Sequence, residues 1–131
     1  MSRDHILLVD DDDDIREVAA MSLEAIGGWR VSSARSGSDG VAAALADPPD
    51  VILLDVMMPD LDGPATFACL QADPRTSSIP VVLLTAKAQA ADRRRMDGLG
   101  VAGTLTKPFD PMTLSDQVRA LLAGAPGNLP S

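Results

Sequence analysis

Five short stretches of the sequence have the composition of β-strands, and longer stretches with helical spacing separate them. They cover residues 6–9, 30–34, 51–54, 81–84 and 103–105. Three of them are runs of Val, Ile and Leu without polar alternation, which is typical of a parallel sheet that is covered on both faces. The order of strands and helices therefore predicts an α/β protein: a doubly wound, five-stranded parallel sheet with helices on both faces.

The segments between and after the strands predict five helices. Asp14 and Glu17 resemble a capping box at the start of the first helix, and Gly27-Gly28 ends it. Its expected inward face consists of Ile15, Val18, Ala19, Ser22 and Ile26. The other helices are expected at residues 38–46, from 63 or 64 onward, at 89–99 and at 111–123. Residues 1–123 are thus predicted to form one domain, and the Gly/Pro-rich residues 124–131 a disordered tail.

The composition indicates how the core is built and which compartment suits the chain. Hydrophobic residues make up 46% of the 131 residues but aromatic residues only 2%, so the core has to be aliphatic. Cys69 is the only cysteine, which excludes an internal disulfide and favours a reducing compartment. Its apolar neighbours predict a small buried side chain, whereas His5 is expected to be exposed at a strand start.

Charge and hydropathy exclude several classes of partner. The net charge of −8 argues against direct binding of nucleic acid or of an anionic membrane surface. No apolar run approaches the roughly 20 residues of a membrane span, and the N-terminus does not resemble a signal peptide. We therefore expect a soluble, cytoplasmic protein.

Chemically useful side chains follow four of the predicted strands. Asp10 and Asp11 follow the first strand, Asp55 the third, Thr85 the fourth, and Lys107 comes directly after the fifth. Because the carboxyl ends of parallel strands meet at one edge of a sheet, we expect these groups to lie together. Crowded carboxylates favour a hard divalent cation, and the residue pattern fits Mg²⁺ rather than the calcium loop of an EF-hand.

The remaining carboxylates of the acidic run have a simpler interpretation. Asp12, Asp13 and Asp14 are expected to form a solvated acidic helix start, which the helix dipole favours.

Four segments in this order resemble the response-regulator receiver domains of bacterial two-component signalling. They are "ILLVDDDDDIREV", "VILLDVMMPDLDG", "IPVVLLTAKA" and "LTKPFD". The resemblance extends from about residue 6 to residue 122, and it implies a stand-alone, chemotaxis-regulator-like receiver. It implies the flavodoxin-like fold of these domains.

The resemblance also implies a phosphorylation site that depends on a metal. Asp55 corresponds to the phosphoacceptor. Asp11 and Asp55 correspond to direct Mg²⁺ ligands, the main-chain carbonyl of Met57 to a third, and Asp10 to a residue that acts through water.

Further positions correspond to the machinery that binds the phosphoryl group and responds to it. Thr85 matches the switch hydroxyl, the main-chain amide of Ala86 a phosphoryl donor, and Lys107 the phosphoryl-binding lysine. The peptide bond between Lys107 and Pro108 is cis in the family. Thr104 occupies the position where family members usually carry Tyr or Phe, so the coupling of phosphorylation to output is expected to differ here.

The function implied is that of a signalling receiver, which catalyses only its own phosphorylation and dephosphorylation. The phosphoryl group would come from the phosphohistidine of a histidine kinase or phosphotransfer protein. Output would pass to a downstream partner, or to a second copy, through the fourth helix, fifth strand and fifth helix. That fourth helix carries Arg93, Arg94 and Arg95, which form either a solvated face or a docking patch for an acidic partner.

Other functions are compatible with parts of the pattern. The chain could be a receiver from a longer regulator with an effector domain, or a module that binds partners without phosphorylation. A phosphatase of the haloacid-dehalogenase type is disfavoured, because it needs a second Asp where this chain has Met57. The sequence does not identify the kinase, the pathway, the oligomeric state or the dephosphorylation rate.

Overall fold

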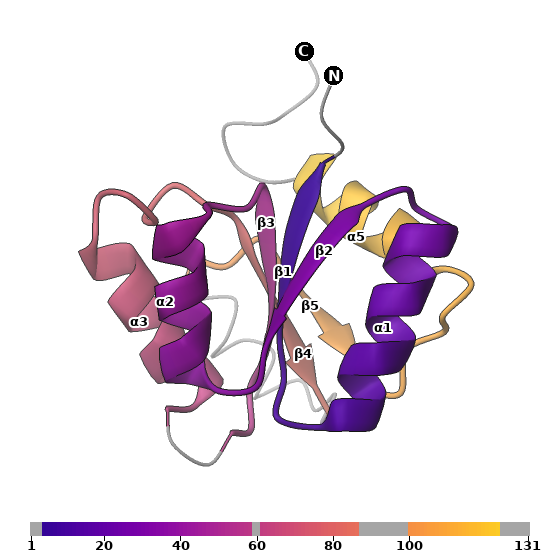
Figure 1. Ribbon diagram of the computed structural model, residues 1–131, viewed down its shortest axis with the longest axis horizontal. Helices are drawn as coiled ribbons and strands as arrows, with labels where there is room; N and C mark the ends of the chain where they lie inside the picture. Colours follow the sequence, from indigo (N-terminus) through magenta and orange to yellow (C-terminus); the bar gives the residue numbers. More distant parts are fainter. Residues whose placement is uncertain (1–3, 59–60, 87–99, 124–131) are drawn as a thin grey trace.

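The computed structural model describes residues 4–58, 61–86 and 100–123 (Figure 1). The strands are β1 (His5–Val9), β2 (Arg30–Ala34), β3 (Val51–Asp55), β4 (Val81–Thr85) and β5 (Gly103–Thr106). The helices are α1 (Asp13–Ala25), α2 (Gly37–Ala46), α3 (Gly63–Ala72) and α5 (Leu114–Ala123). The helix expected at residues 89–99, with Arg93, Arg94 and Arg95, and the tail at 124–131 lie outside the described residues.

The strands form one parallel sheet in the order β2-β1-β3-β4-β5, which confirms the predicted doubly wound fold. In Figure 1 the sheet is seen nearly edge-on, with α2 and α3 covering one face and α1 and α5 the other. The chain leaves β1 toward β2 on one side and returns to pair β3 on the other. The order of strands therefore reverses between β1 and β3, where folds of this class place their binding sites.

Alternating side chains of the strands form two aliphatic cores, one on each face. Leu7 and Val9 of β1 belong to the core beneath α2 and α3, whereas Ile6 and Leu8 belong to the core beneath α1 and α5. All four side chains are at most 1% exposed, as expected for a sheet covered on both faces.

The register between the strands decides which side chains meet at the carboxyl edge. Val9 is aligned with Leu54, so the next residues, Asp10 and Asp55, come side by side where β1 and β3 end. Thr85 of β4 is aligned with Thr106 of β5, which brings the following Lys107 to the same edge.

Helix α1 differs from its prediction at its start. The N-cap is Asp12, whose carboxylate accepts hydrogen bonds from the main-chain N–H groups of Asp14 and Ile15 at 2.9 and 3.1 Å. The capping box expected from Asp14 and Glu17 was therefore wrong. Any of the consecutive Asp residues could cap the helix by composition, and the exit of the chain from β1 selects Asp12.

The inward face of α1 was also predicted only in part. Ala19 and Ser22 are buried as expected, together with Leu23, but Val18 is 45% and Ile26 47% exposed. Helical periodicity groups apolar residues without showing which of them touch the sheet. Val18 and Ile26 instead line a surface pocket beside Pro111, which precedes α5.

Two single residues lie opposite to expectation. His5 is 4% exposed, and its Nε2 atom lies 2.8 Å from the Ser32 hydroxyl of β2. Cys69 is exposed on α3, because Phe67 and Leu70 occupy the inward face of that short helix.

Helix α5 begins at Leu114 rather than at Pro111. Leu114 and Val118 are fully buried, whereas Leu121 and Leu122 are partly buried. Among the described residues, no helix is both long and apolar enough to cross a membrane.

Candidate phosphoacceptor and metal site

Three carboxylates meet at the carboxyl edge of the sheet. Asp10 follows β1 and is fully buried, Asp55 ends β3 and is 5% exposed, and Asp11 is exposed. One carboxylate oxygen from each of the three lies within 4.8 Å of the other two. The structure thus brings together the three acidic residues that the sequence singled out.

Lys107 is the cation of this cluster. Its Nζ atom lies 2.6 Å from Oδ2 of Asp10 and 3.1 Å from Oδ1 of Asp55. Its main-chain N–H donates to the carbonyl of Thr85 at 2.7 Å, which fixes the end of β5 against β4. The Lys107–Pro108 peptide bond is cis. One ammonium group therefore faces three carboxylates, and the cluster carries excess negative charge when all are ionised.

Burial and neighbouring charges shift the protonation equilibria of the cluster. Burial is the main reason why the pKa of Asp55 is raised, and the Asp10 carboxylate adds to it, although the hydrogen bond from Lys107 opposes both. Burial alone would lower the pKa of Lys107, but hydrogen bonds to Asp10 and Asp55 outweigh it and raise that pKa. The Asp55 carboxylate is thus a destabilised anion beside a fixed cation.

The donor set fits Mg²⁺. This ion binds carboxylate oxygens and retains water, and the exposed Asp11 leaves the cluster open to solvent on one side. Both oxygens of Asp10 already accept hydrogen bonds, Oδ1 from the Asp12 N–H at 2.9 Å and Oδ2 from Lys107. Asp11 and Asp55 are therefore better placed than Asp10 to bind a cation directly.

The residues around the cluster include three that the sequence assigned to it, Met57, Thr85 and Ala86, and one that it did not. The N–H of Met57, whose side chain is 72% exposed, lies 3.4 Å from Oδ1 of Asp55. Thr85 is buried at the end of β4, and Ala86 is exposed directly after it. Arg16 was missed: its guanidinium donates to the main-chain carbonyl of Asp10 at 2.7 Å. No sequence signal marks Arg16, since an Arg on an acidic helix normally reads as a surface residue.

Thr104 lies on β5, aligned with Leu83 of β4. Its hydroxyl is buried, and within the described part of the chain it has no hydrogen-bond partner. The aromatic side chain expected there in related domains is absent from the sequence, as the chain contains no Tyr and its two Phe residues lie elsewhere.

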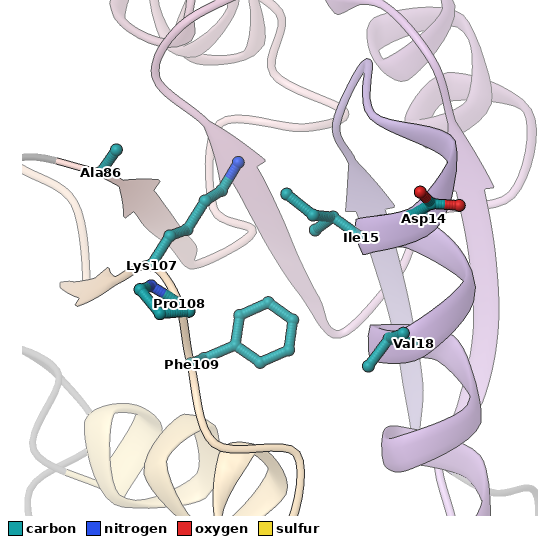
Figure 2. Close-up of a pocket in the computed structure, with 7 residues that line it drawn as sticks. All are labelled: Asp14, Ile15, Val18, Ala86, Lys107, Pro108 and Phe109. Atoms are coloured by element: carbon teal, nitrogen blue, oxygen red, sulfur yellow. The ribbon is translucent and has the colours of Figure 1, made fainter.

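An apolar pocket of about 550 Å³ opens beside Lys107 (Figure 2). Ile15 and Val18 of α1 form one wall of the pocket, and Lys107, Pro108 and Phe109 form the facing wall. This pocket could not be predicted from the sequence, because the residues of α1 and those after β5 are distant in the chain. The sequence shows that Ile15, Val18 and Phe109 are apolar, but not that they line a surface pocket.

The chain belongs to the response regulator receiver domains, the signalling modules of two-component systems. The model of that family matches residues 6–119. The chain is 42% identical to protein PilH of Pseudomonas aeruginosa over 120 residues, which cover 91% of this chain and 98% of PilH.

Other relatives are longer proteins. The chain is 41% identical to the DNA-binding dual master transcriptional regulator RpaA of Synechocystis over 117 residues, which are 89% of this chain but 48% of RpaA. The chain thus spans about half the length of this relative and of the transcriptional regulatory protein CseB of Streptomyces coelicolor.

Solved structures agree with the fold. The chemotaxis response regulator CheY4 of Vibrio cholerae superposes with a TM-score of 0.86 at 28% identity, and the match covers 92% of this chain and all of CheY4. The chain is therefore a receiver domain similar to PilH in sequence and to CheY4 in structure.

Proposed function

We propose that Asp55 accepts a phosphoryl group from the phosphohistidine of a histidine kinase or phosphotransfer protein. The observation that carries this proposal is the contact of Lys107 Nζ with both Asp10 and Asp55, in a cluster that also contains Asp11. A carboxylate becomes a workable nucleophile toward phosphorus when nearby cations neutralise the charge of the incoming group.

In the proposed reaction, a carboxylate oxygen of Asp55 attacks the phosphorus, and the bond from phosphorus to the donor imidazole breaks. The products are an acyl phosphate on Asp55 and a free imidazole on the donor. Lys107 stabilises the charge on the phosphoryl oxygens, and Asp11, Asp55 and the Met57 carbonyl would hold Mg²⁺, with Asp10 acting through water. Bound Mg²⁺ supplies electrostatic stabilisation of the transferring group.

The proposed response to phosphorylation involves the end of β4. The acyl phosphate adds negative charge and acceptor oxygens. The Thr85 hydroxyl and the Ala86 N–H would donate to these oxygens and draw the following loop toward Asp55. Because position 104 carries Thr, we propose that output does not use an aromatic side chain there.

The pocket beside Lys107 supports an approach of the donor along α1. A donor must bring its phosphohistidine to Asp55, and the apolar surface nearest to Lys107 is formed by Ile15, Val18 and Phe109. The exposed acidic residue Asp14 also lines this pocket. We therefore propose a donor with apolar side chains flanked by basic ones at this face.

We further propose that output passes through residues 87–99, β5 and α5, to a downstream protein or a second copy. The proposed receiver domain spans residues 1–123, with 124–131 as a tail, in a cytoplasmic protein. Its chemistry would be confined to its own phosphorylation and dephosphorylation. The alternative is a receiver within a longer regulator, as in RpaA, of which the match covers 48%.

Intact-protein mass spectrometry after incubation with acetyl phosphate and Mg²⁺ tests the proposal. We expect one phosphoryl group on the wild type and none on Asp55→Asn or after addition of EDTA. Asp47→Asn is the matched control, because Asp47 is exposed and paired with Arg30 at the opposite edge of the sheet, and it should be labelled normally. An unlabelled wild type, sampled also at short times to detect rapid hydrolysis, would contradict the proposal and favour a phosphorylation-independent binding module.

A further inference from the structure

Arg16 is unusual among the arginines of this structure in how deeply its side chain is buried. It is 14% exposed, whereas the other arginines that form ion pairs in the described residues are 44–68% exposed. Its Nη1 atom donates to the main-chain carbonyl of Asp10 at 2.7 Å, and Nη2 contacts the carboxylate of Asp13. A guanidinium group is thus held against the loop that carries the acidic cluster.

The accepting carbonyl belongs to the peptide unit that joins Asp10 to Asp11. Because a peptide unit is planar, fixing its oxygen also fixes the direction in which the chain enters Asp11. The other side of the loop is tied as well, since the Asp12 N–H donates to the Asp10 carboxylate at 2.9 Å and Asp12 caps α1. Asp11 therefore lies between two fixed points, although it is itself exposed.

We propose that Arg16 is a positioning residue, which orients the Asp10–Asp11 peptide so that the Asp11 carboxylate is ready to bind a divalent cation together with Asp55. This inference rests on the Mg²⁺ site of the proposed function. It assigns the side chain a role through the Asp10 carbonyl and not through contact with the cation.

Loss of the Arg16 charge and loss of its positioning role should change the affinity for a divalent cation in opposite directions. Removing a cation from the neighbourhood of three carboxylates strengthens cation binding by Coulomb attraction alone. Releasing the peptide weakens it, since groups that orient metal ligands are worth about 10- to 100-fold in metal affinity. A weaker site after removal of a positive charge is therefore a signature of positioning.

The test is a titration of metal alone, MgCl₂, at constant ionic strength, followed by NMR amide shifts and calorimetry. We expect Arg16→Met to raise the Kd for Mg²⁺ about tenfold. Arg16→Lys, which retains the charge and one donor, should recover most of the affinity. Arg30→Met removes the same charge from the opposite edge of the sheet and should leave the Kd unchanged.

The outcomes separate this inference from the proposed function. A wild type that binds no Mg²⁺ would overturn both. A wild type that binds Mg²⁺, with Arg16→Met binding equally well or more tightly, would overturn the positioning role alone. If Arg16→Met does not fold without metal, Arg16→Gln decides instead: weaker binding than Arg16→Lys supports the role, and tighter binding than the wild type overturns it.

Discussion

The two edges of the sheet both carry charged side chains, but they arrange them differently. At the amino edge Arg30 pairs with Asp47 and Arg119 with Asp4, each at 3.0 Å, and these side chains are 44–59% exposed. At the carboxyl edge Lys107 is 14% exposed and contacts two carboxylates of the acidic cluster, one of them on the fully buried Asp10.

The difference separates ion pairs that neutralise each other at the surface from a cluster whose excess negative charge can bind a cation. Exposed one-to-one pairs contribute little to stability and leave no net charge to be neutralised. Buried groups with an excess of one sign destabilise the fold, and such clusters are typical of functional sites. The comparison therefore locates the site independently of any similarity to other proteins.

The largest expected effect comes from removing the cation of the carboxyl edge. Lys107→Met leaves Asp10 buried beside Asp55 without its ammonium partner, and we expect a loss of about 3 kcal/mol in the free energy of unfolding. Because the pKa of Lys107 is raised, this difference should hold up to the ordinary lysine pKa of about 10.4 and disappear as the pH rises through the folded-state pKa.

Urea unfolding followed by the fluorescence of Trp29, the only tryptophan, measures this effect. Arg30→Met is the control at the amino edge and should unfold close to the wild type. Equal stability losses in the two variants would show that the edges do not differ as proposed.

The second expected effect is stabilisation by Mg²⁺. Binding to the folded chain alone should add about 1.4 kcal/mol at a concentration ten times the Kd, and raise the unfolding temperature accordingly. Asp11→Asn removes one proposed ligand without disturbing the buried pair, so the stabilisation should be lost. A calorimetric scan with and without Mg²⁺ measures it, and an undiminished shift in Asp11→Asn would remove this residue from the proposed metal site.

The smallest expected effect is a gain in stability without metal. Asp55→Asn replaces a buried anion with a neutral group of the same shape, and should stabilise the metal-free chain at neutral pH by about 1 kcal/mol. The sign follows from the raised pKa of Asp55: wild-type stability falls as the pH rises from about 3.9 through the folded-state pKa. The stability of Asp55→Asn does not depend on this titration, because the variant lacks the carboxyl group at position 55.

Thermal unfolding in EDTA between pH 3 and 7 checks the prediction, with Asp47→Asn as the variant in which an exposed carboxylate is lost. The stability of Asp55→Asn relative to the wild type should increase with pH over this range. A constant difference, or a decrease, would contradict the view that the Asp55 carboxylate is a destabilised anion.

Much of the fold followed from local sequence patterns. The apolar runs ending at Val9, Leu54 and Leu84 predicted buried parallel strands, and the carboxylate or hydroxyl after each run predicted one chemical edge. The exposure of Val18 and the burial of His5 were not predicted, since both depend on which faces of the elements pack together. Composition does not encode those contacts.

By itself, the sequence determined the order of strands and helices and the presence of Asp10, Asp11, Asp55, Thr85 and Lys107 at strand ends. It did so because strand burial and chain order are properties of local segments. Only the tertiary structure decided that Lys107 contacts both Asp10 and Asp55, and that Arg16 holds the Asp10 carbonyl. These contacts depend on the register of neighbouring strands and on the packing of α1 against the sheet, which join residues up to 97 positions apart.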